Sequence, residues 1–139
     1  MKTNLLFGIL TFLAVAILET IINQILLSPI YGSLSALWRQ TEELKANASI
    51  FFGIYGVFSF SYVWLFLKSY QGKGWLEGAM IGLALGGIAK FWYGYTNYIV
   101  LPIPHSLGFL WFVYGTVELL LIGIFSAAFI DRTKHNPGK

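Results

Sequence analysis

Cysteine is absent from this chain of 139 residues, and only 11% of its residues are charged. The first absence excludes disulfides, thiolate metal sites and cysteine nucleophiles. The second argues against a soluble domain, because a water-exposed surface needs charged residues, whereas lipid covers apolar side chains. The sequence also lacks metal-ligand spacing, a phosphate-binding glycine loop and a serine–histidine arrangement. We therefore expect no catalytic residue, no metal and no cofactor.

The residues that are present are mainly apolar, since 57% of the chain is hydrophobic. About 20 consecutive apolar residues cross the roughly 30 Å of membrane hydrocarbon. Four runs reach or approach that length, and polar or proline-containing turns separate them; the runs cover residues 5–27, 50–67, 76–100 and 107–129. The sequence thus predicts an all-α fold, a bundle of four transmembrane helices in which residues 1–139 form a single membrane domain.

The basic residues outside these runs predict the orientation of the bundle. With an even number of spans, both termini share a side with the connection between the second and third runs. That side carries Lys2, Lys68, Lys73, Arg132, Lys134 and Lys139, against Arg39 and Lys45 on the other side. Cytoplasmic flanks are enriched in lysine and arginine, so we expect both termini in the cytoplasm. Because this placement explains the net charge of +3 without a basic patch, we expect no nucleic-acid partner.

The connection between the first and second runs, residues 31–49, lies on the opposite side. Its apolar residues recur at helical spacing with charges between them, which is typical of a short amphipathic helix on a membrane surface. A solvated loop explains the same composition. The sequence leaves these two alternatives open.

Three charged residues fall inside the apolar runs: Glu19, Lys90 and Glu118. A charge at the centre of a membrane helix costs at least about 2.5 kcal/mol, so such residues are candidates for function. Counted from the cytoplasmic end of each run, the three lie within roughly 5 Å of one level. We predict that they meet in one polar network. Two acids and one base leave one excess negative charge, so we expect either a protonated glutamate, or a bound cation or water-filled cavity.

A row of glycines in the third run predicts the direction of Lys90. Gly78, Gly82, Gly86 and Gly94 recur at multiples of four residues, and Lys90 occupies the remaining position in the row. This spacing places all five on one helix face, where glycine lets a neighbouring backbone approach closely. We therefore predict that the row packs against another helix and that Lys90 points into the bundle.

Polar residues near the three charges complete the predicted site. Asn23 follows Glu19 by four residues, Asn97 follows Lys90 by seven, and Tyr114 precedes Glu118 by four, so each shares a helix face with a charge. The predicted ion- or small-ligand-binding residues are Glu19, Asn23, Lys90, Asn97, Tyr114 and Glu118. A buried salt bridge that only holds the helices in register is the alternative.

Short motifs in the last third of the chain carry a family resemblance. Tyr95-Thr96-Asn97-Tyr98 and Leu101-Pro102 precede an apolar run that contains Val117-Glu118-Leu119-Leu120 and Gly123. With four spans in a chain of this length, the layout resembles uncharacterised small four-span bacterial inner-membrane proteins. The resemblance implies this architecture and a location in the bacterial inner membrane, and it carries no chemistry over.

Three functions fit these features. The first is a proton- or cation-linked transport or permeation protein, which works as a homo-oligomer because four short helices enclose little volume. The second is an accessory or assembly subunit of a larger membrane complex, in which the charged network is structural. The third, an enzyme with Glu19 or Glu118 as general acid or base, lacks a supporting motif. In each case the lipid bilayer is a partner.

Overall fold

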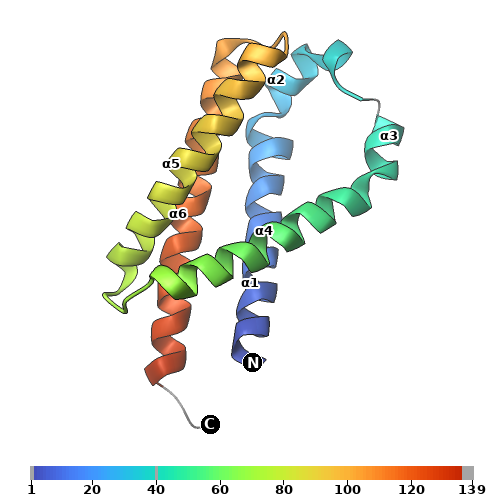
Figure 1. Ribbon diagram of the computed structural model, residues 1–139. Helices are drawn as coiled ribbons and strands as arrows, with labels where there is room; N and C mark the ends of the chain where they lie inside the picture. The colour runs from blue at the N-terminus through green and yellow to red at the C-terminus, as the bar shows by residue number, and fades with distance from the viewer. Residues whose placement is uncertain (1, 40, 136–139) are drawn as a thin grey trace. The chain divides into compact units, whose positions relative to one another are not determined.

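The computed structural model describes residues 2–39 and 41–135 (Figure 1). This part of the chain is all-helical, which confirms the predicted fold class at that level. Its elements, in chain order, are α1 (Lys2–Thr20), the π-helix η1 (Ile21–Leu26), α2 (Ser28–Ser33), the 3-10 helix η2 (Ser35–Leu37), α3 (Thr41–Ala46), α4 (Ala48–Ser69), α5 (Trp75–Val100) and α6 (His105–His135). Three of the basic residues that predict the orientation are not fully described. Lys139 lies outside the described residues, as do the side chains of Lys2 and Lys134.

Three helical stretches are long and apolar enough to cross a membrane, which indicates a membrane protein. They are Thr3–Leu26, Ala48–Ser69 and His105–Thr133. The 26-residue α5 is long enough but is not among the three. Its sequence includes Glu77, Lys90 and Asn97, which lower its hydropathy.

The chain forms two compact units, Met1–Val63 and Trp64–Lys139, and the boundary falls inside α4. In the first unit, α1 continues into η1, where the wider π-helical turn ends with the Leu27 N–H donating to the Ile22 carbonyl at 2.9 Å. Pro29 then lies in the first turn of α2, where its missing N–H and restricted φ are tolerated. The serine–proline pair therefore separates two helical segments instead of opening an irregular loop.

The connection between η1 and α4 contains short helical segments. The 3-10 helix η2 and the single α-helical segment α3 are separated by extended backbone at Trp38. All six residues of α3 are exposed, and two ion pairs, Arg39 with Glu43 and Lys45 with Glu42, follow its surface. Residues 31–49 thus contain separate short turns of helix and not one continuous amphipathic helix.

The second unit is built on the pairing of α5 with α6, which run side by side along most of their length (Figure 1). The turn between them contains Pro102 and Pro104, and Ile103 within the turn and Leu107 in the first turn of α6 are buried. The two helices run in opposite directions because this turn is only four residues long. Such a short connection leaves antiparallel neighbours as the natural arrangement.

The glycine row of α5 lies against the backbone of α6. Gly78 faces Gly123, Gly82 faces Leu119, Gly86 faces Thr116, and Gly94 faces Gly108. At each of these positions a Cβ atom would overlap the backbone or Cβ atoms of the opposite helix. The row therefore sets the distance between the two helices, because only glycine allows backbones to approach so closely.

Candidate functional site

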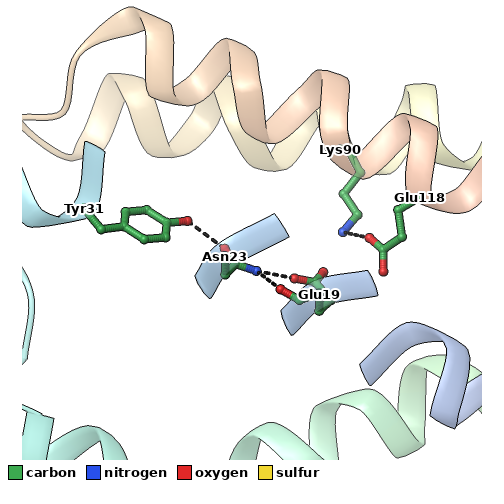
Figure 2. A network of polar contacts seen from close by, with 5 residues as sticks. All are labelled: Glu19, Asn23, Tyr31, Lys90 and Glu118. Carbon is green, nitrogen blue, oxygen red and sulfur yellow. Dashed lines mark hydrogen bonds and ion pairs between the residues drawn. The ribbon is translucent and has the colours of Figure 1, made fainter. Parts of the chain in front are cut away.

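Lys90 and Glu118 form an ion pair between α5 and α6, with Lys90 Nζ 3.1 Å from Glu118 Oε2 (Figure 2). Only 2% of the Glu118 side chain is exposed, against 22% of the Lys90 side chain. A buried charge that is paired and hydrogen-bonded costs far less free energy than a lone charge. Each of the two residues therefore makes the other tolerable in an apolar environment.

Gly115 provides the space that Lys90 needs to reach its partner. It lies on α6 three residues before Glu118, and a Cβ atom on it would fall 2.7 Å from Lys90 Cγ and 2.8 Å from Lys90 Cε. Real Cβ contacts are longer than this, so the lysine stem occupies the volume of the missing side chain. Gly115 thereby lets the stem lie against the α6 backbone, with the ammonium group at Glu118.

Glu19 belongs to a second polar group, which lies in the first unit. The Tyr31 hydroxyl donates to Asn23 Oδ1 at 2.7 Å, and Asn23 Nδ2 donates to Glu19 Oε2 at 2.6 Å and to the Glu19 carbonyl at 3.0 Å (Figure 2). Because Tyr31 donates to the amide oxygen, the NH₂ group of Asn23 is directed to the carboxyl group. Trp38 packs edge-on against Tyr31 with ring centroids 5.4 Å apart. Three side chains thus connect the first spanning helix with α2.

The π-helix places Asn23 for this role. Asn23 is the third residue of η1, and Tyr31 lies beyond both η1 and the start of α2. A π-helical turn holds one residue more than an α-helical hydrogen-bonded turn, so it changes the direction of the side chains that follow, and such turns are frequent at functional sites. The irregular stretch therefore begins just after Glu19 and contains Asn23.

The other predicted site residues have less defined surroundings. Asn97 is half-buried, and its Nδ2 donates to the Tyr93 carbonyl of its own helix at 2.8 Å. Tyr114 is half-buried on α6, one turn before Glu118. The structure brings Lys90 and Glu118 together in the second unit and describes Glu19 with Asn23 in the first. A single network of all three charges stays a prediction.

Sequence reasoning missed Tyr31 and a group of residues at the turn between α4 and α5. Tyr31 lies eight residues after Asn23, a separation that matches no helical period once a π-helix intervenes. At the turn, Tyr70 donates to Asp131 across 61 residues of sequence, which no local pattern reveals. At the same turn, the Glu77 carboxylate accepts two hydrogen bonds from the backbone, one from the Gln71 N–H and one from the Lys73 N–H.

Among the residues that the structure describes, no group of three or more histidine, aspartate or glutamate side chains is arranged to hold a metal ion. Searches with the chain against protein-family models, curated proteins and solved structures found no match. The resemblance to small bacterial inner-membrane proteins therefore stays a prediction. A function must be argued from the two polar groups themselves.

Proposed function

We propose that the chain crosses the membrane four times, with α5 as the fourth span and both termini in the cytoplasm. Three observations support this. A 26-residue helix is about 39 Å long, which is enough to cross the hydrocarbon. The α5 helix packs along α6, which is itself a candidate span. The charge that most disfavours insertion of α5, that of Lys90, is compensated by Glu118.

The natural absence of cysteine makes this topology directly testable. We expect the single variants Ser35→Cys and Ser106→Cys to react from outside intact cells with a membrane-impermeant maleimide, and Gln71→Cys to react only after the membrane is opened. All three positions are exposed; Ser35 and Gln71 lie between the proposed spans, and Ser106 is the second residue of α6, next to the turn that follows α5. If α5 did not cross the membrane, residues 71 and 106 would lie on the same side and would be labelled alike.

We propose further that the protein is a proton- or cation-linked transport or permeation protein of a cell membrane, acting as a homo-oligomer. The ion pair between Lys90 and Glu118 carries this proposal. Ionisable residues in spanning helices are costly and are characteristic of ion and proton pathways. A proton or cation that reaches the Glu118 carboxylate competes with the Lys90 ammonium group. The Lys90 stem lies against Gly115, and its rotation would let the ammonium group leave Glu118 and return.

The first unit supports the same function. Glu19 offers a second carboxyl group in a spanning helix, and Asn23 and Tyr31 extend its polar surroundings as far as α2. Thr11 on α1 and Ser59 on α4 add buried hydroxyl oxygens that have no hydrogen-bond partner among the described residues. Buried polar atoms of this kind are usual partners of internal water. Polar groups are thus available at several points of this apolar unit.

Flux measurements test the transport proposal. Purified protein in vesicles should dissipate an imposed proton or monovalent cation gradient, and Glu118→Gln and Glu19→Gln should each slow the flux by about tenfold or more, equivalent to at least about 1.4 kcal/mol in the barrier. Glu42→Gln is the matched control, because it makes the same chemical change on the exposed α3. Wild-type protein that carries no flux under either gradient would contradict the proposal.

An accessory or assembly subunit of a larger membrane complex is the second candidate function. The exposed apolar face of α5 favours it. Ile88, Trp92 and Ile99 are 76%, 74% and 81% exposed, so this helix presents a broad apolar face that lipid or another membrane protein covers. In that case the ion pair serves only to hold α5 on α6. Paired substitutions of Lys90 and Glu118 separate the two functions.

A further inference from the structure

The turn between α4 and α5 is joined to the end of α6 by the hydroxyl group of Tyr70. This hydroxyl donates to Asp131 Oδ2 at 2.8 Å and accepts from the Gly74 N–H at 3.1 Å. Tyr70 is only 9% exposed, and burial raises its pKa, as does its hydrogen bond to Asp131. The phenol therefore remains a donor throughout the physiological pH range, and it holds the turn to α6 at one point.

The two acidic residues of this region are directed into the turn. Glu77 Oε1 accepts from the Gln71 N–H and Oε2 from the Lys73 N–H, both at 2.9 Å. Asp131 accepts the hydrogen bond from Tyr70. Gly72 and Gly74 have φ values of 88° and 86°, which other residues rarely adopt, so the chain can turn tightly around the Glu77 carboxylate. Both carboxylates thus accept hydrogen bonds from the turn.

The basic residues of the same region remain at the surface. Lys68, Lys73 and Arg132 are exposed. Each is close in sequence to a residue of the Tyr70 hydrogen bonds: Lys68 precedes Tyr70 by two residues, Lys73 precedes Gly74, and Arg132 follows Asp131. We call these three residues the basic turn. Lys68 Nζ lies 5.2 Å above the ring of Trp64, a cation–π contact that keeps the ammonium group beside an aromatic side chain.

Exposed apolar residues adjoin the basic turn. Trp64 and Trp75, on either side of it in the sequence, are 60% and 62% exposed, and the neighbouring Leu76 is 60% exposed. Tryptophan favours the headgroup level of a bilayer, where one part of the ring is apolar and the other is wet. Positive charges next to exposed tryptophans match a molecule with an anionic phosphate and apolar tails.

We propose that the basic turn binds the phosphate group of anionic phospholipids, with Trp64 and Trp75 beside the lipid at headgroup level. The other two loop cations of the described chain offer a contrast. Arg39 lies 3.3 Å from Glu43, and Lys45 lies 3.1 Å from Glu42, so each is neutralised by an exposed carboxylate. In the basic turn, Glu77 and Asp131 instead accept hydrogen bonds from backbone N–H groups and from the Tyr70 hydroxyl, and Tyr70 is its positioning residue.

The test titrates phosphatidylglycerol and, separately, phosphatidylcholine into the detergent-solubilised full chain, with bound lipids counted by native mass spectrometry. In detergent the protein has no bilayer orientation. The effect of loop charges on membrane orientation therefore does not change the measured lipid preference. We expect wild-type protein to prefer phosphatidylglycerol. Each basic residue near an anionic surface strengthens attraction roughly fivefold, so Lys68→Gln, Lys73→Gln and Arg132→Gln combined should remove most of the preference.

Matched controls make the outcomes decisive. The double variant Arg39→Gln with Lys45→Gln should keep the wild-type preference, although it also removes two loop cations. Tyr70→Phe keeps all three cations but loses their positioning bond, so its preference should fall to an intermediate level while its helical circular dichroism is unchanged. Full preference in the triple variant, or equal loss in the control, would overturn the proposal. Displacement of the lipid by millimolar inorganic phosphate would overturn it too, because the site would then be one for free phosphate.

Discussion

Replacing Gly82 with alanine is expected to destabilise the pairing of α5 with α6 by about 3 kcal/mol, at the upper end of the usual cost of overpacking. A Cβ atom at this position would overlap the Leu119 carbonyl of α6 and would fall 3.0 Å from Leu120 Cα. These are backbone atoms, which cannot rotate away as the end of a flexible side chain can. The two helices must therefore separate, and the other glycine contacts along the row would loosen with them.

Gly87→Ala is the matched control for this substitution. It lies on the same helix, five residues after Gly82, and a Cβ atom there would have nothing within 4 Å. Alanine favours helix over glycine by roughly 1 kcal/mol, so we expect this variant to be neutral or slightly stabilised. Denaturant titration of both variants in detergent, followed by circular dichroism, measures the difference. Equal stability of the two variants would contradict the assigned packing of the glycine row.

The second large effect is expected at the ion pair. Lys90→Met removes the ammonium group that pairs with the 2%-exposed Glu118, and removal of one member of a buried pair typically costs about 3–5 kcal/mol. Glu118→Gln should cost less, because Lys90 is 22% exposed and its long stem lets the ammonium group move toward water. The ranking of the two single variants by free energy of unfolding therefore tests the burial that the structure assigns to each side chain.

The double variant, Lys90→Met with Glu118→Gln, separates structure from function. It removes both charges, so we expect it to recover much of the stability that Lys90→Met alone loses, with a coupling energy of roughly 1–3 kcal/mol. If gradient-driven flux stays lost in this stable double variant, the ion pair belongs to the transport pathway. If every property returns with stability, the pair is structural and the accessory-subunit candidate is favoured. Additive effects of the two substitutions would refute the pairing itself.

The helices were predictable from the sequence because their signal is local. The predicted runs 50–67 and 76–100 correspond to α4 and α5, whose ends differ by only one or two residues. The predicted run 107–129 is longer in the structure, since α6 ends at His135. Apolar length shows where a helix crosses hydrocarbon, but backbone hydrogen bonding continues past the last apolar residue. The short helical segments of residues 31–49 could not be predicted individually. Isolated helical turns are marginal without tertiary contacts, so they leave little local signal in the sequence.

The candidate site was predictable only in part. Periodicity placed Lys90 in the glycine row, and counting along the helices placed Glu118 at a similar depth, so both could be proposed as partners. The contact of the Lys90 stem with Gly115 could not be predicted. It depends on the rotation of α6 about its axis, which a sequence period does not define to within one residue. Tyr31 and Tyr70 form their bonds across a π-helix and across 61 residues, where no repeating pattern links the two positions.

The sequence by itself determined that this is a helical chain with membrane-crossing stretches and a few costly charges within its apolar runs. Composition and apolar length are sums over neighbouring residues, so they need no knowledge of packing. Only the tertiary structure decided that Lys90 lies over Gly115 and reaches Glu118, and that Glu77 and Asp131 accept hydrogen bonds at the turn while the cations stay exposed. These features depend on which faces of two helices meet, and backbone contacts between glycines set that choice at atomic distances.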